Sequence, residues 1–198
     1  LAWWAEHQPQ AKLIFMGTSC VYAPGSDLCE TDYMLGEPID SLYTYAMTKR
    51  MLYQGARALS QQFGLRYLCL VPSTLYGGGY HTDGRQMHFI FDLIRKIIRG
   101  KEYGETVSLW GDGYQKRELV LVDDFVSILW ALTQKFDNEI FNIGAGEEYP
   151  IRTFAEMICT TIGYPVENIE YDTSRYVGAK SKCLNVVKIK AALPEYTL

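Results

Sequence analysis

Short apolar segments alternate with longer amphipathic segments along the chain. Segments with the length and composition of buried strands cover residues 12–16, 66–71, 107–110, 118–122, 140–143 and 169–171. Between them the sequence predicts helices at about 43–63, 86–99, 123–134 and 151–162, after a helix end at about 1–8. Strands that alternate with helices predict an α/β fold with a mostly parallel sheet.

Glycines and acidic residues predict where several of these helices begin and end. We expect Gly64 to end the helix at 43–63 and Gly100 to end the helix at 86–99, because glycine is the common residue after a helix. Asp123 and Asp124 stand where a helix amino end favours carboxylates. No glycine-rich phosphate loop of the GxxGxxG type follows a strand in this sequence. Gly77-Gly78-Gly79 is a run of glycines without the spacing of that motif.

Composition narrows the possible partners. The 198 residues are 48% hydrophobic and carry a formal net charge of −4, which argues against nucleic acid or an anionic membrane surface as a partner. No apolar run has the length of a membrane span. The five cysteines form no CxxC pair, and the three histidines show no metal-ligand spacing. We therefore expect a cytoplasmic protein with reduced thiols and no metal site.

Tyr45 and Lys49 are the strongest chemical signal. A spacing of four places both side chains on one face of the predicted helix. A cation beside a phenol stabilises the phenolate, so such a tyrosine can exchange a proton near neutral pH. Thr18 follows the strand at 12–16 and offers a hydroxyl that can hold a substrate oxygen. These three residues suit the interconversion of an alcohol and a ketone beside a hydride carrier.

Several motifs in order resemble the extended short-chain dehydrogenases/reductases and, within them, the epimerase/reductases that make GDP-L-fucose. The resemblance covers almost the whole chain. Its motifs lie at residues 15–22, 45–49, 72–77, 110–118, 122–124, 142–146 and 171–175. The implied fold is the C-terminal part of a Rossmann domain at 1–71, and a smaller α/β substrate-binding domain at 72–198 with late Rossmann elements interleaved at about 117–143. We expect the chain to be a fragment that lacks the glycine-rich part of that family's fold.

The resemblance also implies the chemistry of the site. The family transfers a hydride from NADPH to C4 of GDP-4-keto-6-deoxy-mannose, with Tyr45 as the acid, Lys49 beside it and Thr18 on the C4 oxygen. Cys20 and His88 stand at the positions of the cysteine and histidine that epimerise C3 and C5. Both epimerisations rest on the acidity of protons next to a ketone.

Further residues match cofactor and substrate positions. Tyr45, Lys49 and Pro72 are expected to face the cofactor, and the expected substrate residues are Thr74, Lys96, Trp110, Arg117 and Lys182. Thr74 stands where the family usually has asparagine, and residues 175–178 replace a usual Lys-Pro-Asp-Gly. The resemblance further implies a homodimer through the helix at 43–63.

Other interpretations stay open at this point. A 4-epimerase or a 4,6-dehydratase with tightly held NAD is the alternative enzyme, and a non-catalytic relative of the same fold is the alternative from another class. Cys20 is also explained as a small packed residue, and His88 as a surface residue at a helix start. Surface charge alone explains Arg117 and Lys182 equally simply, and packing explains Trp110.

Overall fold

A three-stranded parallel sheet lies at the centre of the larger part of the molecule. The computed structural model describes residues 1–8, 10–80 and 87–196. The sheet has the order β1 (Lys12–Met16), β3 (Arg66–Pro72) and β8 (Glu139–Ile143). Ile14 pairs with Leu68, and Leu70 pairs with Phe141. The three strands therefore end at one common edge.

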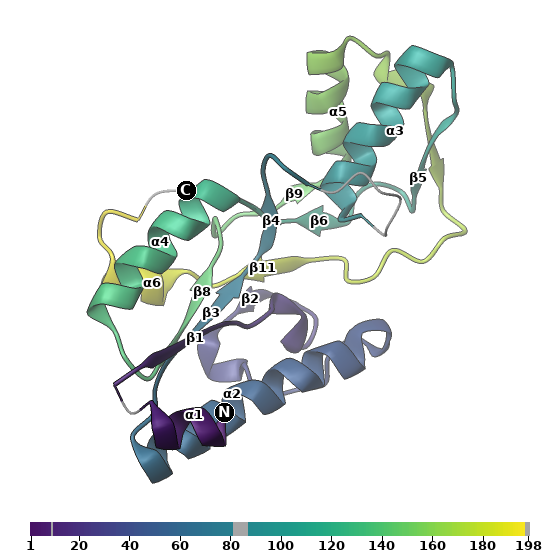
Figure 1. The fold of residues 1–198 in the computed structure, drawn as a ribbon. Helices are drawn as coiled ribbons and strands as arrows, with labels where there is room; N and C mark the ends of the chain where they lie inside the picture. The colour runs from purple at the N-terminus through teal and green to yellow at the C-terminus, as the bar shows by residue number, and fades with distance from the viewer. Residues whose placement is uncertain (9, 81–86, 197–198) are drawn as a thin grey trace.

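Helices cover both faces of this sheet (Figure 1). On one face lie α1 (Ala2–His7) and α2 (Tyr43–Phe63), and on the other lie α4 (Val122–Lys135) and α6 (Val187–Ala192). Side chains of β3 alternate between the two faces, because successive residues of a strand point in opposite directions. Cys69 packs in the core with α2, whereas Leu68 and Leu70 pack in the core with α4 and α6. All five central residues of β3 are buried, as expected for a parallel strand covered twice.

A second core lies in a smaller part of the molecule, which Figure 1 shows above the sheet. It contains α3 (Phe89–Tyr103), α5 (Ile151–Ile162), β5 (Val107–Trp110) and β10 (Ile169–Asp172). β5 and β10 pair in parallel, although some 60 residues separate them along the chain. The two helices pack their apolar faces on this pair, with Ile97 of α3 and Ala155 of α5 fully buried.

Short strand pairs join the two parts. β4 (Thr74–Tyr76) pairs with β7 (Leu119–Leu121), β6 (Lys116–Arg117) with β9 (Tyr149–Pro150), and β2 (Gly25–Leu28) with β11 (Lys182–Leu184). Single 3₁₀ turns complete the connections at η1 (Ser19–Val21), η2 (Glu30–Asp32), η3 (Asp40–Leu42) and η4 (Val166–Asn168). Every one of these strand pairs connects segments distant in sequence.

Predicted and observed boundaries agree in most elements. The helix at 43–63 is confirmed, and Gly64 follows it in the left-handed conformation. The prediction that Gly100 ends the next helix is wrong, because α3 continues to Tyr103 and Gly104 ends it. Gly100 is buried inside the helix, where a Cβ would lie 2.4 Å from Val107 Cγ2. Residue 86, where this helix was predicted to begin, lies outside the described residues.

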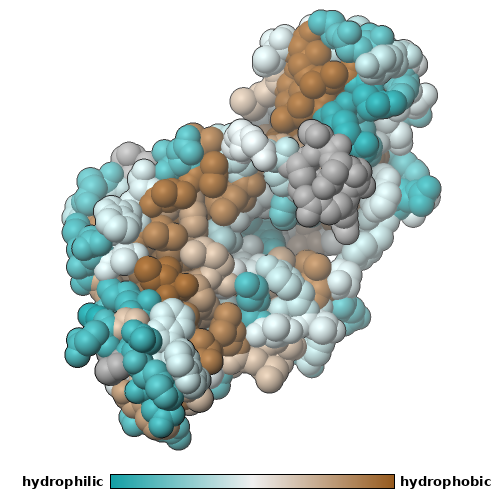
Figure 2. All heavy atoms as spheres, in the orientation of Figure 1, coloured by the Kyte–Doolittle hydropathy of each residue, from teal (hydrophilic) through white to brown (hydrophobic). Residues whose placement is uncertain are grey.

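Apolar side chains are also present on the surface. Figure 2 shows them in a band over the part that holds the sheet and in a second group over the smaller part. Ile14 and Met16 of β1 are only partly buried, and Val126 and Trp130 of α4 are exposed. None of the helices in the described ranges has the length and hydropathy needed to cross a membrane.

Candidate active site

The carboxyl end of β1 presents Thr18. The strand ends at Gly17, whose N–H donates to Leu70 O of the neighbouring strand at 2.7 Å. Thr18 is buried, and its Oγ1 accepts a hydrogen bond from Cys20 N at 3.2 Å, which begins the turn η1. A Cβ at Gly17 would lie 2.8 Å from Tyr33 Oη, so the chain passes here only because the residue is glycine.

Tyr45 and Lys49 lie on α2 next to this strand end. Lys49 Nζ donates a hydrogen bond to Met16 O at 2.9 Å and lies 5.8 Å from the centre of the Tyr45 ring. Tyr45 is 47% exposed. The structure therefore brings the helical pair to the edge of the sheet where β1 ends.

Arg50 is a residue of this region that the sequence analysis missed. It is 5% exposed, and its guanidinium donates to Val21 O at 2.6 Å and to Gly36 O at 2.8 Å, with a further bond to Leu35 O. These bonds fix the long segment after β1 against α2. A charged residue on an amphipathic helix normally indicates a solvent-facing position, so no local signal distinguishes it.

Cys20 lies beside Lys182, a residue expected on the substrate. Lys182 Nζ is 3.1 Å from Cys20 Sγ, and both residues are partly buried. They border a cavity of about 20 Å³, which is the size of roughly one water molecule. All five cysteines of the chain are free thiols.

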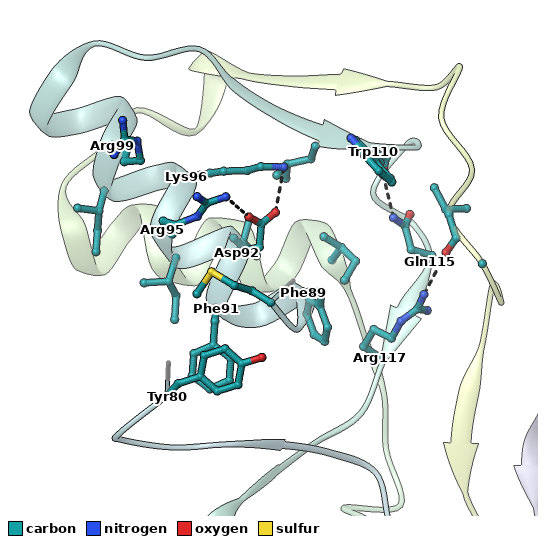
Figure 3. Close-up of a pocket in the computed structure, with 18 of the residues that line it drawn as sticks. Tyr80, Phe89, Phe91, Asp92, Arg95, Lys96, Arg99, Trp110, Gln115 and Arg117 are labelled. Carbon is teal, nitrogen blue, oxygen red and sulfur yellow. Dashed lines mark hydrogen bonds and ion pairs between the residues drawn. The ribbon is translucent and has the colours of Figure 1, made fainter. Parts of the chain in front are cut away.

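A much larger pocket, of about 990 Å³, lies between α3, the end of β5 and the segment that follows β10 (Figure 3). Three of the predicted substrate residues line it: Lys96 from α3, Trp110 from β5 and Arg117 from β6. Its volume is in the range of sites that take a drug-sized or nucleotide-sized ligand.

Cations gather on the α3 side of this pocket, where Figure 3 shows Arg95, Lys96 and Arg99. Asp92 pairs with Arg95 at 2.7 Å and with Lys96 at 3.0 Å, and Lys96 Nζ also donates to Ser108 O. Burial alone raises the pKa of Asp92, but the hydrogen bonds and charges of the two cations outweigh it, and the pKa lies below its usual value. The carboxylate therefore stays ionised and holds both cations at the pocket wall.

Arg117 stands on the opposite wall. Its guanidinium donates to Val177 O at 3.1 Å and to Ala179 O at 2.9 Å, which ties the segment after β10 to β6. Burial lowers the pKa of Arg117, and nearby Glu148 and Cys20 partly oppose that effect. Arg175, which sequence reasoning did not select, lies with its guanidinium carbon 5.6 Å from the centre of the Trp110 ring.

The remaining predicted residues lie outside this pocket. His88 is the exposed N-cap of α3, and its backbone N–H donates to Tyr80 Oη at 3.0 Å. Pro72 ends β3 and Thr74 begins β4, and both are half-buried. Most of the predicted residues thus lie in one group at the end of β1 or in one around the large pocket, whereas His88, at the start of α3, belongs to neither.

Residues 1–8, 10–80 and 87–196 contain no group of three or more His, Cys, Asp or Glu side chains placed to hold a metal ion.

Known proteins resemble this chain in sequence and in fold. A GDP-L-fucose synthase from Azorhizobium caulinodans is 28% identical over 193 residues, which cover 94% of this chain and 62% of the relative. A UDP-glucose 4-epimerase from Thermotoga maritima, solved with UDP-glucose, superposes with a TM-score of 0.78 at 25% identity, over 91% of this chain and 56% of that one. A GDP-L-fucose synthetase from Naegleria fowleri bound to NADP superposes with a TM-score of 0.82 at 22% identity, over 94% and 58%.

The family follows from these comparisons. The chain spans about three-fifths of the length of the relatives that it matches. The Rossmann-type α/β fold and the resemblance to the extended short-chain dehydrogenases/reductases are confirmed. The model of the NAD dependent epimerase/dehydratase family matches residues 1–144, and the chain belongs to that family.

Proposed function

We propose that this chain carries the catalytic residues of a nucleotide-sugar epimerase/reductase that converts GDP-4-keto-6-deoxy-D-mannose to GDP-L-fucose with NADPH. The observation that carries the proposal is the placement of Lys49 Nζ between Met16 O, at 2.9 Å, and the Tyr45 ring, at 5.8 Å. The tyrosine and its cation thereby meet the strand end where Thr18 lies.

Tyr45 protonates the C4 oxygen in this scheme, and Thr18 donates a hydrogen bond that holds the same oxygen. The cofactor supplies the hydride when it is bound. Lys49 stabilises the negative charge left on the phenol oxygen. Its ammonium has three donors, of which Met16 O takes one, so it also suits a ribose hydroxyl of the cofactor. Pro72 lies at the carboxyl end of the neighbouring strand β3 and is assigned to the same cofactor face.

Cys20 and His88 exchange the protons on C3 and C5. The C4 ketone makes both protons acidic, so a thiolate removes one and an imidazolium returns one on the other face. Cys20 is two residues from Thr18 and bonds to it through its backbone N–H.

The large pocket is assigned to the nucleotide diphosphate. Arg117 and Lys96 stand on opposite walls and provide charges for phosphate oxygens, and Trp110 provides an exposed aromatic face. Thr74 and Lys182 remain assigned to the substrate by resemblance, although neither lines this pocket.

A 4-epimerase is the second candidate. It is favoured by the structural similarity to the UDP-glucose 4-epimerase, which covers 91% of this chain, against 94% for the synthetase. Tyr45, Lys49 and Thr18 would serve that reaction equally well, whereas Cys20 and His88 would have no role in it.

Turnover of GDP-4-keto-6-deoxy-mannose tests the proposal, with oxidation of NADPH followed by absorbance. We expect turnover in the protein and a loss of about 10²–10⁴-fold in Tyr45→Phe. A protein that leaves this sugar unchanged but interconverts C4 epimers of a nucleotide sugar would establish the second candidate instead.

We also propose a homodimer through α2. The helix exposes Met51, which is 72% accessible, and Phe63, which is 54% accessible. Light scattering on the protein and on Met51→Arg tests this, since a charge at the interface should yield monomers.

A further inference from the structure

The backbone of Lys182 is held in place by the carboxylate of Glu148. Glu148 accepts a hydrogen bond from Lys182 N at 2.8 Å and another from Ser181 Oγ at 2.6 Å. Both carboxylate oxygens of Glu148 are thus engaged at the start of β11. The backbone of Lys182 is therefore fixed at the start of β11.

A second carboxylate fixes the same strand two residues further on. Glu118, which is 2% exposed, accepts from Leu184 N at 3.1 Å and from Gly146 N at 2.7 Å. A Cβ at Gly144 would lie 2.3 Å from Glu118 Oε1, so the loop after β8 closes tightly around the carboxylate. Two buried or half-buried carboxylates consequently hold β11 from the side opposite to β2.

β2, the strand that pairs with β11, begins a few residues after Cys20 in the sequence. Lys182 pairs with Gly25 of β2, which follows Cys20 by five residues. Arg50 fixes the backbone at Val21, next to Cys20. The sulfur and the ammonium are therefore each attached to backbone that is hydrogen-bonded in place, and the two atoms lie 3.1 Å apart.

We propose that Lys182 is a positioning residue for Cys20. Its ammonium donates a hydrogen bond to Cys20 Sγ and compensates negative charge on that sulfur. This proposal rests on the proposed function, in which Cys20 removes a proton from a carbon next to the C4 ketone. In that step the C–H bond breaks, an S–H bond forms and the electron pair passes to the enolate, while Lys182 keeps its charge. Hydrogen bonds from an ammonium to an anionic acceptor are stronger than those to a neutral one, so the contact orients the sulfur most firmly when the sulfur carries negative charge.

This assignment differs from what the resemblance implies, because it directs Lys182 to the sulfur rather than to the nucleotide. Arg117 is another cation that acts electrostatically on Cys20, but its guanidinium donates to the carbonyl oxygens of Lys116, Ala179 and Val177. Lys182 alone of these two cations contacts the sulfur directly.

Competition between two alkylating reagents tests the proposal without substrate or cofactor. Iodoacetate is an anion and iodoacetamide is its neutral analogue, so the ratio of their products at one thiol reports the charge beside it. Peptide mass spectrometry gives this ratio for Cys20, with the partly exposed Cys29 as the internal reference. We expect a higher carboxymethyl share at Cys20 than at Cys29.

Variants at Lys182 and at a control lysine define the expected pattern. Lys182→Met should lower the ratio at Cys20 about fivefold, which corresponds to about 1 kcal/mol for a unit charge at this range. Lys182→Arg should preserve it, and Lys180→Met should leave it unchanged because Lys180 is an exposed lysine two residues away. Lys182→Gln removes the charge but keeps a donor, and it replaces the methionine variant if that variant does not fold.

A ratio at Cys20 that stays at the wild-type value in folded Lys182→Met or Lys182→Gln would overturn the proposal. The result is independent of the proposed reaction. If Lys182 has no effect on the alkylation ratio at Cys20, the role of Lys182 is refuted and the proposed epimerisation stays open. If Lys182 changes the ratio but the protein exchanges no proton at C3 or C5, the epimerisation is contradicted and the Lys182–Cys20 contact is established.

Discussion

The two groups of site residues differ in how the fold holds them. At the end of β1, side chains bond to the backbone of neighbouring elements, as Lys49 does to Met16 O and Arg50 to Val21 O. Around the large pocket, charged side chains also pair with one another, as Asp92 does with Arg95 and Lys96, and Arg117 donates to the segment after β10. With the proposed function, we infer a division of labour, in which the first region fixes reacting groups and the second region binds a charged ligand.

This division makes a kinetic prediction. In the proposed reaction, residues at the end of β1 contact atoms whose charge changes in the transition state, so these residues should act on turnover. Residues around the pocket should act on KM, since they bind parts of the substrate that do not react.

The largest effect is expected at Tyr45. Tyr45→Phe removes the acid but keeps the ring, so kcat for ketone reduction should fall about 10²–10⁴-fold with KM little changed. Steady-state kinetics measures this change in kcat. Tyr43→Phe is the matched control, because Tyr43 is an exposed tyrosine two residues before Tyr45 on the same helix. Wild-type turnover in Tyr45→Phe would exclude Tyr45 as the acid.

A smaller effect with the opposite kinetic signature is expected at Arg117. Arg117→Met removes a cation from the pocket wall, and loss of a charged hydrogen bond of about 1.5–3 kcal/mol raises KM roughly 10–100-fold. Lys116→Met is the control, since Lys116 is the exposed neighbour on the same short strand. If kcat fell instead and KM stayed constant, the division between the two regions would be wrong.

Glu118 should make stability depend on pH. Burial raises its pKa to about 7 from 4.5, although hydrogen bonds from Gly146, Leu184 and Ala145 partly oppose the shift. The folded protein then binds a proton more tightly than the unfolded chain, so stability is greatest below about pH 4.5 for this group and declines as pH rises towards 7. The decline is up to about 3 kcal/mol for this group alone.

Chemical denaturation between pH 5 and pH 8 measures this decline. In Glu118→Gln the group no longer titrates, so its share of the slope should vanish. The pKa of Glu30 is also raised by burial and contributes a slope of the same sign, which should persist in the variant. A variant with the full wild-type slope would show that Glu118 is not the titrating group.

The smallest effect concerns the loop around Glu118. Gly144→Ala forces a methyl group against the carboxylate at 2.3 Å and should cost about 1–3 kcal/mol in the free energy of unfolding. Gly55→Ala is the control of opposite sign, because a Cβ there meets no atom within 4 Å and alanine favours the helix by up to about 1 kcal/mol. Equal stability of the two variants would contradict the packing around Gly144.

Local sequence patterns predicted the elements whose signals are local. The helix at 43–63 was predicted from a long helical segment that is followed by a glycine. The strands at 12–16 and 66–71 were predicted from short, mostly apolar runs. The end of α3 was misplaced because Gly100 and Gly104 offer the same local signal, and only the contact with Val107 shows why the first is internal.

Features that depend on distant pairing could not be predicted in the same way. β2 and β11 are short polar segments that become strands only because they pair with each other. Glu118 becomes a buried carboxylate only when the loop at Gly146 and the strand at Leu184 close on it. The proximity of Lys182 to Cys20, across 162 positions, likewise comes from that pairing.

The most direct test of the proposed epimerase/reductase is the entry of solvent deuterium into the sugar. In D₂O and without NADPH, the protein should place deuterium at C3 and C5 of GDP-4-keto-6-deoxy-mannose, and Cys20→Ser and His88→Gln should lose this exchange or reduce it steeply. The Tyr45→Phe protein should still exchange, because proton removal at these carbons does not require hydride transfer. An absence of label at C3 and C5 with the unmodified protein would contradict the proposal and favour the 4-epimerase, whose chemistry at C4 leaves both carbons unlabelled.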